Sequence, residues 1–104
     1  MKNLMLSVIL IPVFTSGVMA SEHEIAQKNK TFSAKELKIK RGDTVSFPNH
    51  DPFFHNVFSL SPSKTFDLGS YPKGETRKVT FDKPGKVEVE CAIHPHMFLT
   101  IDVE

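Results

Sequence analysis

The chain has 104 residues, carries 13 basic and 12 acidic side chains, and contains a single cysteine. A chain of this length forms one small domain with a modest core. Because its charges almost cancel, the composition gives no support for a nucleic-acid partner or an anionic membrane surface, and one cysteine excludes an internal disulfide.

Residues 1–20, MKNLMLSVILIPVFTSGVMA, have the layout of a secretory signal peptide. A basic Lys2 precedes an apolar run, and small residues stand close to Ala20. We expect cleavage after Ala20, so that residues 21–104 form the exported domain and the mature protein resides in the periplasm. The alternative is an N-terminal membrane anchor. It is disfavoured because Pro12 and the polar residues after it leave the apolar run short for a bilayer span.

Alternation of apolar and polar residues predicts strands through most of the exported domain. We expect a first strand over residues 24–30. Residues 37–40 and 44–47 both alternate, and the Gly-containing turn at residues 41–43 predicts that these two strands pair with each other. The second of them should end at Pro48, since proline cannot donate to a strand ladder.

The second half of the chain is expected to hold four further strands. These are residues 55–60, 76–81, 86–91 and 98–104. Residues 61–76 are rich in Ser, Pro and Gly, and we expect them to form a long surface connection. We find no helical periodicity and no internal repeat. Short strands at close spacing with Pro/Gly turns predict an all-β domain, a small β-sandwich.

The stretch ECAIHPHMF gathers Cys91, His94 and Met97 in the connection between the last two expected strands. In the exported domain, these are the only cysteine and the only methionine. A free thiol in an oxidising compartment is a liability unless it is buried, paired with another chain or bound to metal. Two histidines, one cysteine and a weak axial methionine form the blue-copper arrangement. The best candidate for the second histidine is His55, which starts an apolar strand.

Four alternatives stay open around this cluster. Zinc is the rival metal, but methionine is a poor zinc ligand, so Met97 favours copper. His96 could compete for the metal, although we expect it to point outward, and His50 is expected to be a solvated or hydrogen-bonded loop residue that could tune the site by protonation. The new terminus at residues 21–23 could hold a square-planar Cu(II) or Ni(II), although a disordered terminus is the simpler interpretation.

The segments LKIKRGDTVSFPNHDPFFHNVFS and VEVECAIHPHM resemble the cupredoxins of the plastocyanin and amicyanin group over most of residues 37–104. CAIHPHM has the Cys-x-x-His-x-x-Met spacing of amicyanin. The resemblance implies a Greek-key β-sandwich with one type 1 copper at one end. The ligands that it implies are His55, Cys91, His94 and Met97. It also implies that Asn56 ties the two ligand loops together and donates its backbone N–H to the thiolate, which would raise the reduction potential.

The leading hypothesis is a monomeric one-electron carrier that is not an enzyme. Its partners would be redox proteins such as a c-type cytochrome or a periplasmic dehydrogenase. The edge of His94 would be the electron exit. An apolar docking patch around it would comprise Phe53, Phe54, Pro95 and Phe98. The alternative is copper storage or delivery with the same ligands. Reversible redox cycling without loss of copper would distinguish an electron carrier from a storage or delivery protein. Catalysis at copper is disfavoured because four protein ligands leave no open coordination position.

Overall fold

The structure, a computed structural model, describes residues 20–104, so the expected signal peptide lies outside the described residues apart from Ala20. This part of the chain forms strands and no helix, which confirms the all-β prediction. The strands are β1 (Glu22–Glu24), β2 (Gln27–Lys28), β3 (Thr31–Phe32), β4 (Glu36–Ile39), β5 (Thr44–Pro48), β6 (His55–Ser61), β7 (Lys64–Tyr71), β8 (Thr76–Thr80), β9 (Gly85–Cys91) and β10 (Phe98–Val103). Over the same residues there is no helix of the length and hydrophobicity that a bilayer span requires.

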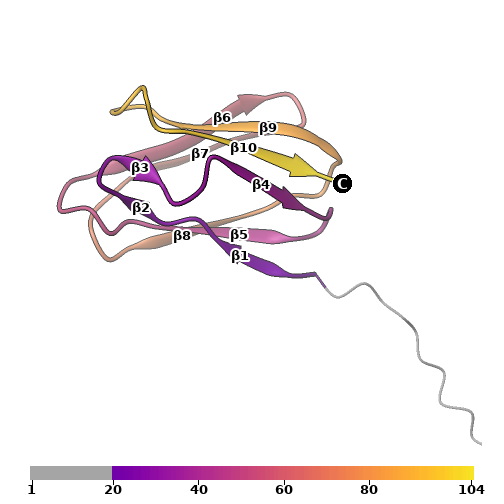
Figure 1. Cartoon of the computed structure of the whole chain (residues 1–104), viewed down its shortest axis with the longest axis horizontal. Coiled ribbons are helices and arrows are strands. Elements are labelled where there is room, and N and C mark those ends of the chain that lie inside the picture. Colours follow the sequence, from indigo (N-terminus) through magenta and orange to yellow (C-terminus); the bar gives the residue numbers. More distant parts are fainter. Residues whose placement is uncertain (1–19) are drawn as a thin grey trace, which may run out of the picture.

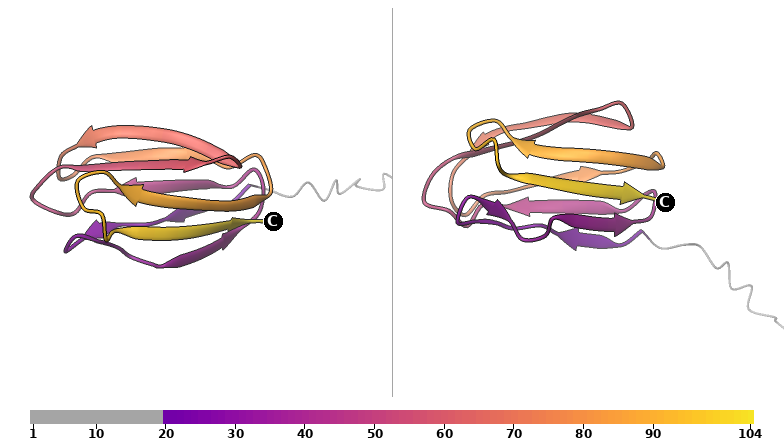
Figure 2. Two further views of the ribbon diagram at one scale, coloured as in Figure 1. Left: turned by 90° about the horizontal axis from the view of Figure 1, so that it is seen from above. Right: turned by 45° about the horizontal axis from the view of Figure 1, so that its top comes forward.

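Two sheets lie face to face and enclose the core (Figures 1 and 2). The larger sheet has the order β4-β10-β9-β6-β7, the smaller has the order β1-β5-β8, and β2 forms a two-stranded sheet with β3. Most neighbours are antiparallel, but β1 runs parallel to β5 and β10 runs parallel to β4. Successive strands often lie in different sheets or beside distant strands, as expected for the predicted Greek-key sandwich.

The core is built from the alternating positions that the sequence indicates. Along β9, Val87, Val89 and Cys91 are buried while the residues between them face outward or are half-buried. Phe47 of β5 and Phe66 of β7 come from opposite sheets, and their ring centroids lie 6.4 Å apart. The apolar faces of the two sheets therefore meet directly, which gives a small domain one continuous core.

The expected pairing of residues 37–40 with residues 44–47 is wrong, because β4 and β5 lie in different sheets. β4 pairs with β10, whereas β5 pairs with β1 and β8. The turn between them crosses from one sheet to the other, with Gly42 at a φ of 92° and its N–H donating to the Phe81 carbonyl. Both strands direct alternate residues into the same core. Alternation of apolar residues is therefore expected both for two strands paired in one sheet and for two strands that face each other across the core.

Two other expectations for single segments also need correction. Residues 61–76 are not a surface connection, because they contain β7, an edge strand of the larger sheet. Phe66 and Leu68 of β7 pack against the core from one face, while an edge position tolerates the polar residues between them. The expected first strand over residues 24–30 is divided, since β1 ends at Glu24 and β2 begins at Gln27.

The N-terminal segment is a strand that pairs with β5 rather than a disordered terminus. His23 Nε2 lies 2.9 Å from Asp43 Oδ2, and the Ser21 and Lys40 N–H groups donate to the same carboxylate at 2.9 and 3.0 Å. The hydrogen bond with His23, followed by those two, lowers the pKa of Asp43 to about 2 against the opposing effect of burial. A square-planar metal site at residues 21–23 stays a prediction, and it would require this segment to leave β5.

We predict that Asp43→Asn weakens the dependence of stability on acid pH. Because the folded-state pKa of about 2 lies below the ordinary 3.8, the carboxylate contributes fully above the ordinary value, and its contribution is lost as the pH falls towards about 2. Thermal unfolding of both proteins between about pH 5 and pH 2 measures this effect. The variant should be the less stable one at the upper pH, and the two melting temperatures should converge towards the lower. A difference in melting temperature between the two proteins that is the same at every pH would contradict the prediction.

Candidate metal centre

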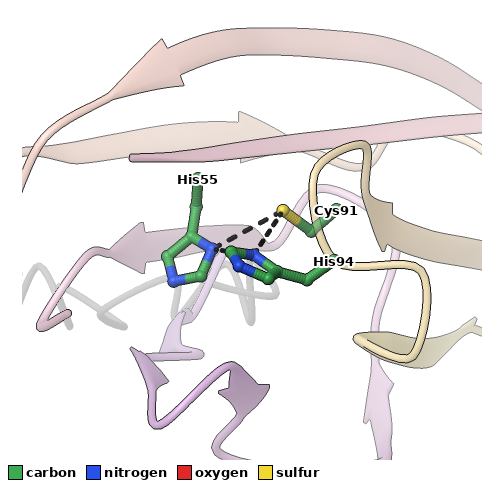
Figure 3. A group of neighbouring side chains, drawn as sticks. All are labelled: His55, Cys91 and His94. Carbon is green, nitrogen blue, oxygen red and sulfur yellow. Dashed lines mark hydrogen bonds between the residues drawn. The ribbon is translucent and has the colours of Figure 1, made fainter. Parts of the chain in front are cut away.

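Two strand ends and one loop bring three of the predicted ligands together at one end of the sandwich (Figure 3). His55 is the first residue of β6, Cys91 is the last residue of β9, and His94 lies in the connection to β10. β6 and β9 are neighbours in the larger sheet, with Val57 opposite Cys91. Their adjacent ends therefore place an imidazole beside a thiol that is 36 residues away in the sequence.

The donor atoms of these three residues form a small triangle. The Cys91 sulfur lies 3.5 Å from His55 Nδ1 and 3.8 Å from His94 Nδ1, and the two nitrogens are 3.2 Å apart. Cys91 and His55 are buried, and His94 is half-buried. Metal bonds of about 2.0 Å to nitrogen and 2.3 Å to sulfur would separate trigonal ligand atoms by roughly 3.5–3.8 Å. One ion of this size therefore fits between the three atoms with little rearrangement.

Met97, the fourth predicted ligand, is buried and follows the same loop. Its backbone N–H donates to the His94 carbonyl at 2.9 Å, which closes a tight turn directly before β10. This bond fixes the two residues relative to each other in the main chain. The thioether as an axial ligand stays a prediction.

A buried carboxylate supports His55 from the side away from the thiol. Asp51 Oδ2 lies 2.7 Å from His55 Nε2, and the carboxylate also accepts the N–H groups of Asn29 and Lys30 at 2.7 and 3.0 Å. Burial by itself raises the pKa of Asp51, but these hydrogen bonds outweigh it and hold the pKa below its ordinary value. Asp51 was not among the site residues predicted from the sequence. Its only signal was a spacing of four residues from His55, which is not specific in a loop.

Phe53 lies against both imidazoles of the centre. Its ring centroid is 5.3 Å from that of His55 and 5.3 Å from that of His94, and the Lys30 ammonium stands 5.6 Å from the Phe53 centroid. Burial, then the neighbouring His55 and the charge of Lys30, lower the pKa of His94. The surroundings thus favour the neutral imidazole, which is the form that binds metal.

The spare histidines lie where the sequence analysis expected them. His96 is exposed, with its ring centroid 6.3 Å from that of His94, and His50 is exposed in the loop before β6. Within residues 20–104, the cluster of potential ligands contains neither of them.

Apolar side chains reach solvent in the two loops that carry the centre. Phe54 is 54% exposed, Ile93 50% and Phe98 43%, and Pro95 is also exposed, whereas Phe53 is half-buried. Ile93 was missing from the expected docking patch. Phe53 is only partly at the surface, because its ring also packs against the rings of His55 and His94. The remaining members of the patch are exposed as expected.

The two ligand loops are joined through Asn56, although not by the bond that the resemblance implies. The Ala92 N–H donates to the Asn56 carbonyl at 3.0 Å. In the part of the chain that the structure describes, the hydrogen-bonding neighbours of the Cys91 sulfur are His55 and His94, and no bond from the Asn56 N–H to the sulfur is seen. The role of Asn56 as a link is supported, while its donation to the thiolate is not observed.

Comparisons with known proteins agree with this geometry. The family described as copper binding proteins, plastocyanin/azurin family, matches residues 19–104. The methylamine utilization protein MauL of Methylorubrum extorquens is 31% identical over 85 residues, which cover 81% of this chain and 75% of MauL. A structure of Cu(I) amicyanin with a methionine-to-alanine substitution matches this chain with a TM-score of 0.74 at 23% sequence identity. The match covers 80% of this chain and 82% of the amicyanin chain. A copper-containing nitrite reductase of Thermus scotoductus has the same TM-score at 29% identity over 80% of this chain, but the chain spans only 22% of that protein.

Proposed function

The chain belongs to the plastocyanin/azurin family of copper-binding proteins, and on that premise we propose that it carries single electrons between redox proteins. The observation that carries this proposal is the triangle of two imidazole nitrogens and one sulfur, with sides of 3.2 to 3.8 Å. Copper, when bound, supplies a reversible one-electron exchange between Cu(I) and Cu(II).

The donor set fits copper better than zinc. A thiolate suits Cu(I), and imidazole suits both oxidation states. A structural zinc site takes four His, Cys or carboxylate ligands, whereas only three such residues gather in the described chain. The buried carboxylate beside the centre, that of Asp51, is bonded to the outer nitrogen of His55. The ligands that we propose are His55, Cys91, His94 and Met97.

The protein contributes a framework that keeps these ligands in place. Cys91 is fixed at the end of β9 and His55 at the start of β6, two neighbouring strands of one sheet. His94 is fixed by the turn that the Met97 N–H closes. Ligand positions that are set by strands and outer hydrogen bonds need little adjustment when an electron arrives or leaves.

The half-buried His94 provides the route by which electrons would leave the centre. Its loop presents Ile93 to solvent, and Phe98 at the start of β10 and Phe54 in the loop before β6 are also exposed. Weak redox encounters use small interfaces of this kind. We propose a c-type cytochrome or a periplasmic dehydrogenase as partner, and the naming of one relative for methylamine utilization is consistent with a dehydrogenase as donor.

Further parts of the proposal concern the whole protein. Residues 1–20 would direct export and be removed after Ala20, and residues 21–104 would act as a periplasmic monomer. We propose that the chain is not an enzyme. The similarity to the nitrite reductase extends over 22% of that protein, so its activity is not carried over to a chain of this size.

We predict an intense thiolate-to-copper absorption band in the visible region when the purified protein receives one equivalent of Cu(II). Spectroelectrochemical cycling should bleach and restore this band repeatedly with the copper content unchanged. A colourless Cu(II) protein would contradict the proposed centre. Release of copper at the first reduction would contradict electron transfer and favour copper storage or delivery with the same ligands.

A further inference from the structure

We propose that Asp51 is a positioning residue of the metal centre: its buried carboxylate fixes the tautomer and orientation of His55 and sets a permanent negative charge one ring away from the metal. The inference rests on the proposed function and deepens it. It assigns to Asp51 a contribution to the affinity of the site for Cu(II) relative to Cu(I).

The contact between Asp51 and His55 determines which ring nitrogen carries the proton. Oδ2 and Nε2 are 2.7 Å apart, and both side chains are buried. A carboxylate can only accept a hydrogen bond, so Nε2 carries a proton, and in the neutral ring that binds metal Nδ1 then keeps its lone pair. Nδ1 is the atom that lies 3.5 Å from the Cys91 sulfur and 3.2 Å from His94 Nδ1 (Figure 3). The ring is therefore prepared for a metal ion before the ion arrives.

The surrounding backbone is shaped to hold this carboxylate. Asn29 and Lys30 form the turn between β2 and β3, and both N–H groups donate to Asp51. Their φ angles of 55° and 58° lie in the left-handed region, which lysine adopts only where other contacts hold it. The buried Asn49 side chain accepts the Asp51 N–H at 2.8 Å. The turn between β2 and β3 thus holds the side chain of Asp51, while Asn49 holds its main chain.

This arrangement has an electrostatic consequence for the centre. The Asp51 carboxylate accepts two backbone N–H groups and contacts a ring nitrogen of His55, as expected for a charged group. A hydrogen bond from a ligating histidine to a carboxylate raises the basicity of the ring. A nearby negative charge that is shielded from water stabilises the ion of higher charge. Asp51 should therefore strengthen Cu(II) binding more than Cu(I) binding and lower the reduction potential.

A second buried aspartate, Asp43, provides a matched control for the replacement of Asp51. Asp43 is also buried, accepts two backbone N–H groups and lies 2.9 Å from the Nε2 of His23. It stands directly before β5, in the β4–β5 turn. Figure 1 shows this turn at the end of the sandwich near the C-terminus, away from the β9–β10 loop. Asp43→Asn removes the same kind of charge and the same kind of histidine partner without touching the centre.

The test compares the reduction potentials of the copper-loaded wild type, Asp51→Asn and Asp43→Asn. A partner of this kind is typically worth 10- to 100-fold in metal affinity. We expect the Cu(II) affinity relative to Cu(I) to fall about tenfold in Asp51→Asn, which raises the potential by ~59 mV for one electron. The potential of Asp43→Asn should stay at the wild-type value. Equal shifts in the two variants, or no shift in Asp51→Asn, would overturn the inference.

A second measurement uses the metal-free wild-type protein and therefore does not depend on copper or on a variant that folds. Nitrogen-15 NMR of the His55 ring should show the proton on Nε2. A proton on Nδ1 would overturn the positioning role. Absence of the visible band in the copper-loaded wild type would instead overturn the proposed function, and the tautomer of His55 would still decide the role of Asp51.

Discussion

Replacing Cys91 by serine should abolish the intense visible band of the Cu(II) protein. The thiolate is the only sulfur donor in the triangle of ligand atoms, and a serine hydroxyl is neither soft nor deprotonated near neutral pH. Loss of a direct ligand should weaken copper binding by more than the roughly 10- to 100-fold that loss of a ligand's hydrogen-bond partner costs. Absorption spectra and a competition titration with a chelator of known copper affinity would measure both effects.

The serine variant should still fold, which keeps the experiment interpretable. Cys91 is buried at the end of β9, and a buried hydroxyl without a partner costs about 1–3 kcal/mol. Circular dichroism of the metal-free protein would verify the fold. His96→Ala is the matched control, because this exposed imidazole lies next to His94 but outside the ligand triangle. It should keep both the band and the copper content. A coloured Cys91→Ser protein, or a colourless His96→Ala protein, would contradict the assignment of ligands.

The local part of the metal centre could be predicted from sequence because its residues are close in the chain. Cys91, His94 and Met97 lie on one short connection, so their spacing alone indicates a shared site. His55 is different, since its place beside Cys91 follows from the pairing of β6 with β9. Alternation along a strand does not encode which strand is its neighbour. His55 was predicted because it starts an apolar strand, and the resemblance to cupredoxins implied it as a ligand, but neither predicted that pairing.

The role of Asp51 could not be predicted by searching the sequence for residue types that bind metal. Its function depends on a hydrogen bond to His55 and on two N–H groups of the turn between β2 and β3. An Asp in a loop is far more often a turn residue than the support of a ligand. Nothing in the sequence shows that Asn29 and Lys30 approach this side chain, because that contact arises only when the two segments pack together.

The errors in the fold prediction share one physical origin. Alternating apolar residues show which face of a strand is buried, and they predicted β9 and β10 correctly. They do not distinguish two strands paired in one sheet from two strands facing each other across a core, so the pairing of β4 with β5 was wrong. β7 was overlooked for a related reason. An edge strand needs only a few core contacts, here the partly buried Phe66 and Leu68 and the buried Tyr71, and its other positions have the composition of a loop.

The largest effect on stability is expected from Phe47→Ala, because this ring joins the two sheets. Phe47 lies on β5 with no exposed surface, and its centroid is 6.5 Å from that of Phe32 and 6.4 Å from that of Phe66 on the opposite sheet. Removing a buried phenyl ring loses its transfer free energy and leaves a cavity, which together cost about 3–5 kcal/mol. Domains of this size have a free energy of unfolding of about 5–15 kcal/mol, so the variant should lose a large share of its stability.

Urea unfolding of the metal-free protein measures this loss without a contribution from copper binding. Leu60→Ala is the control: Leu60 is 74% exposed on β6, so its truncation should change the free energy of unfolding by no more than about 0.5 kcal/mol. The Phe47 carbonyl accepts the Tyr71 hydroxyl at 2.7 Å, and this backbone acceptor is kept in the alanine variant. The difference between the two variants therefore reports the packing of the ring. If the two variants lost similar amounts of stability, the sheets would have to be held together by contacts other than the aromatic ones at Phe47.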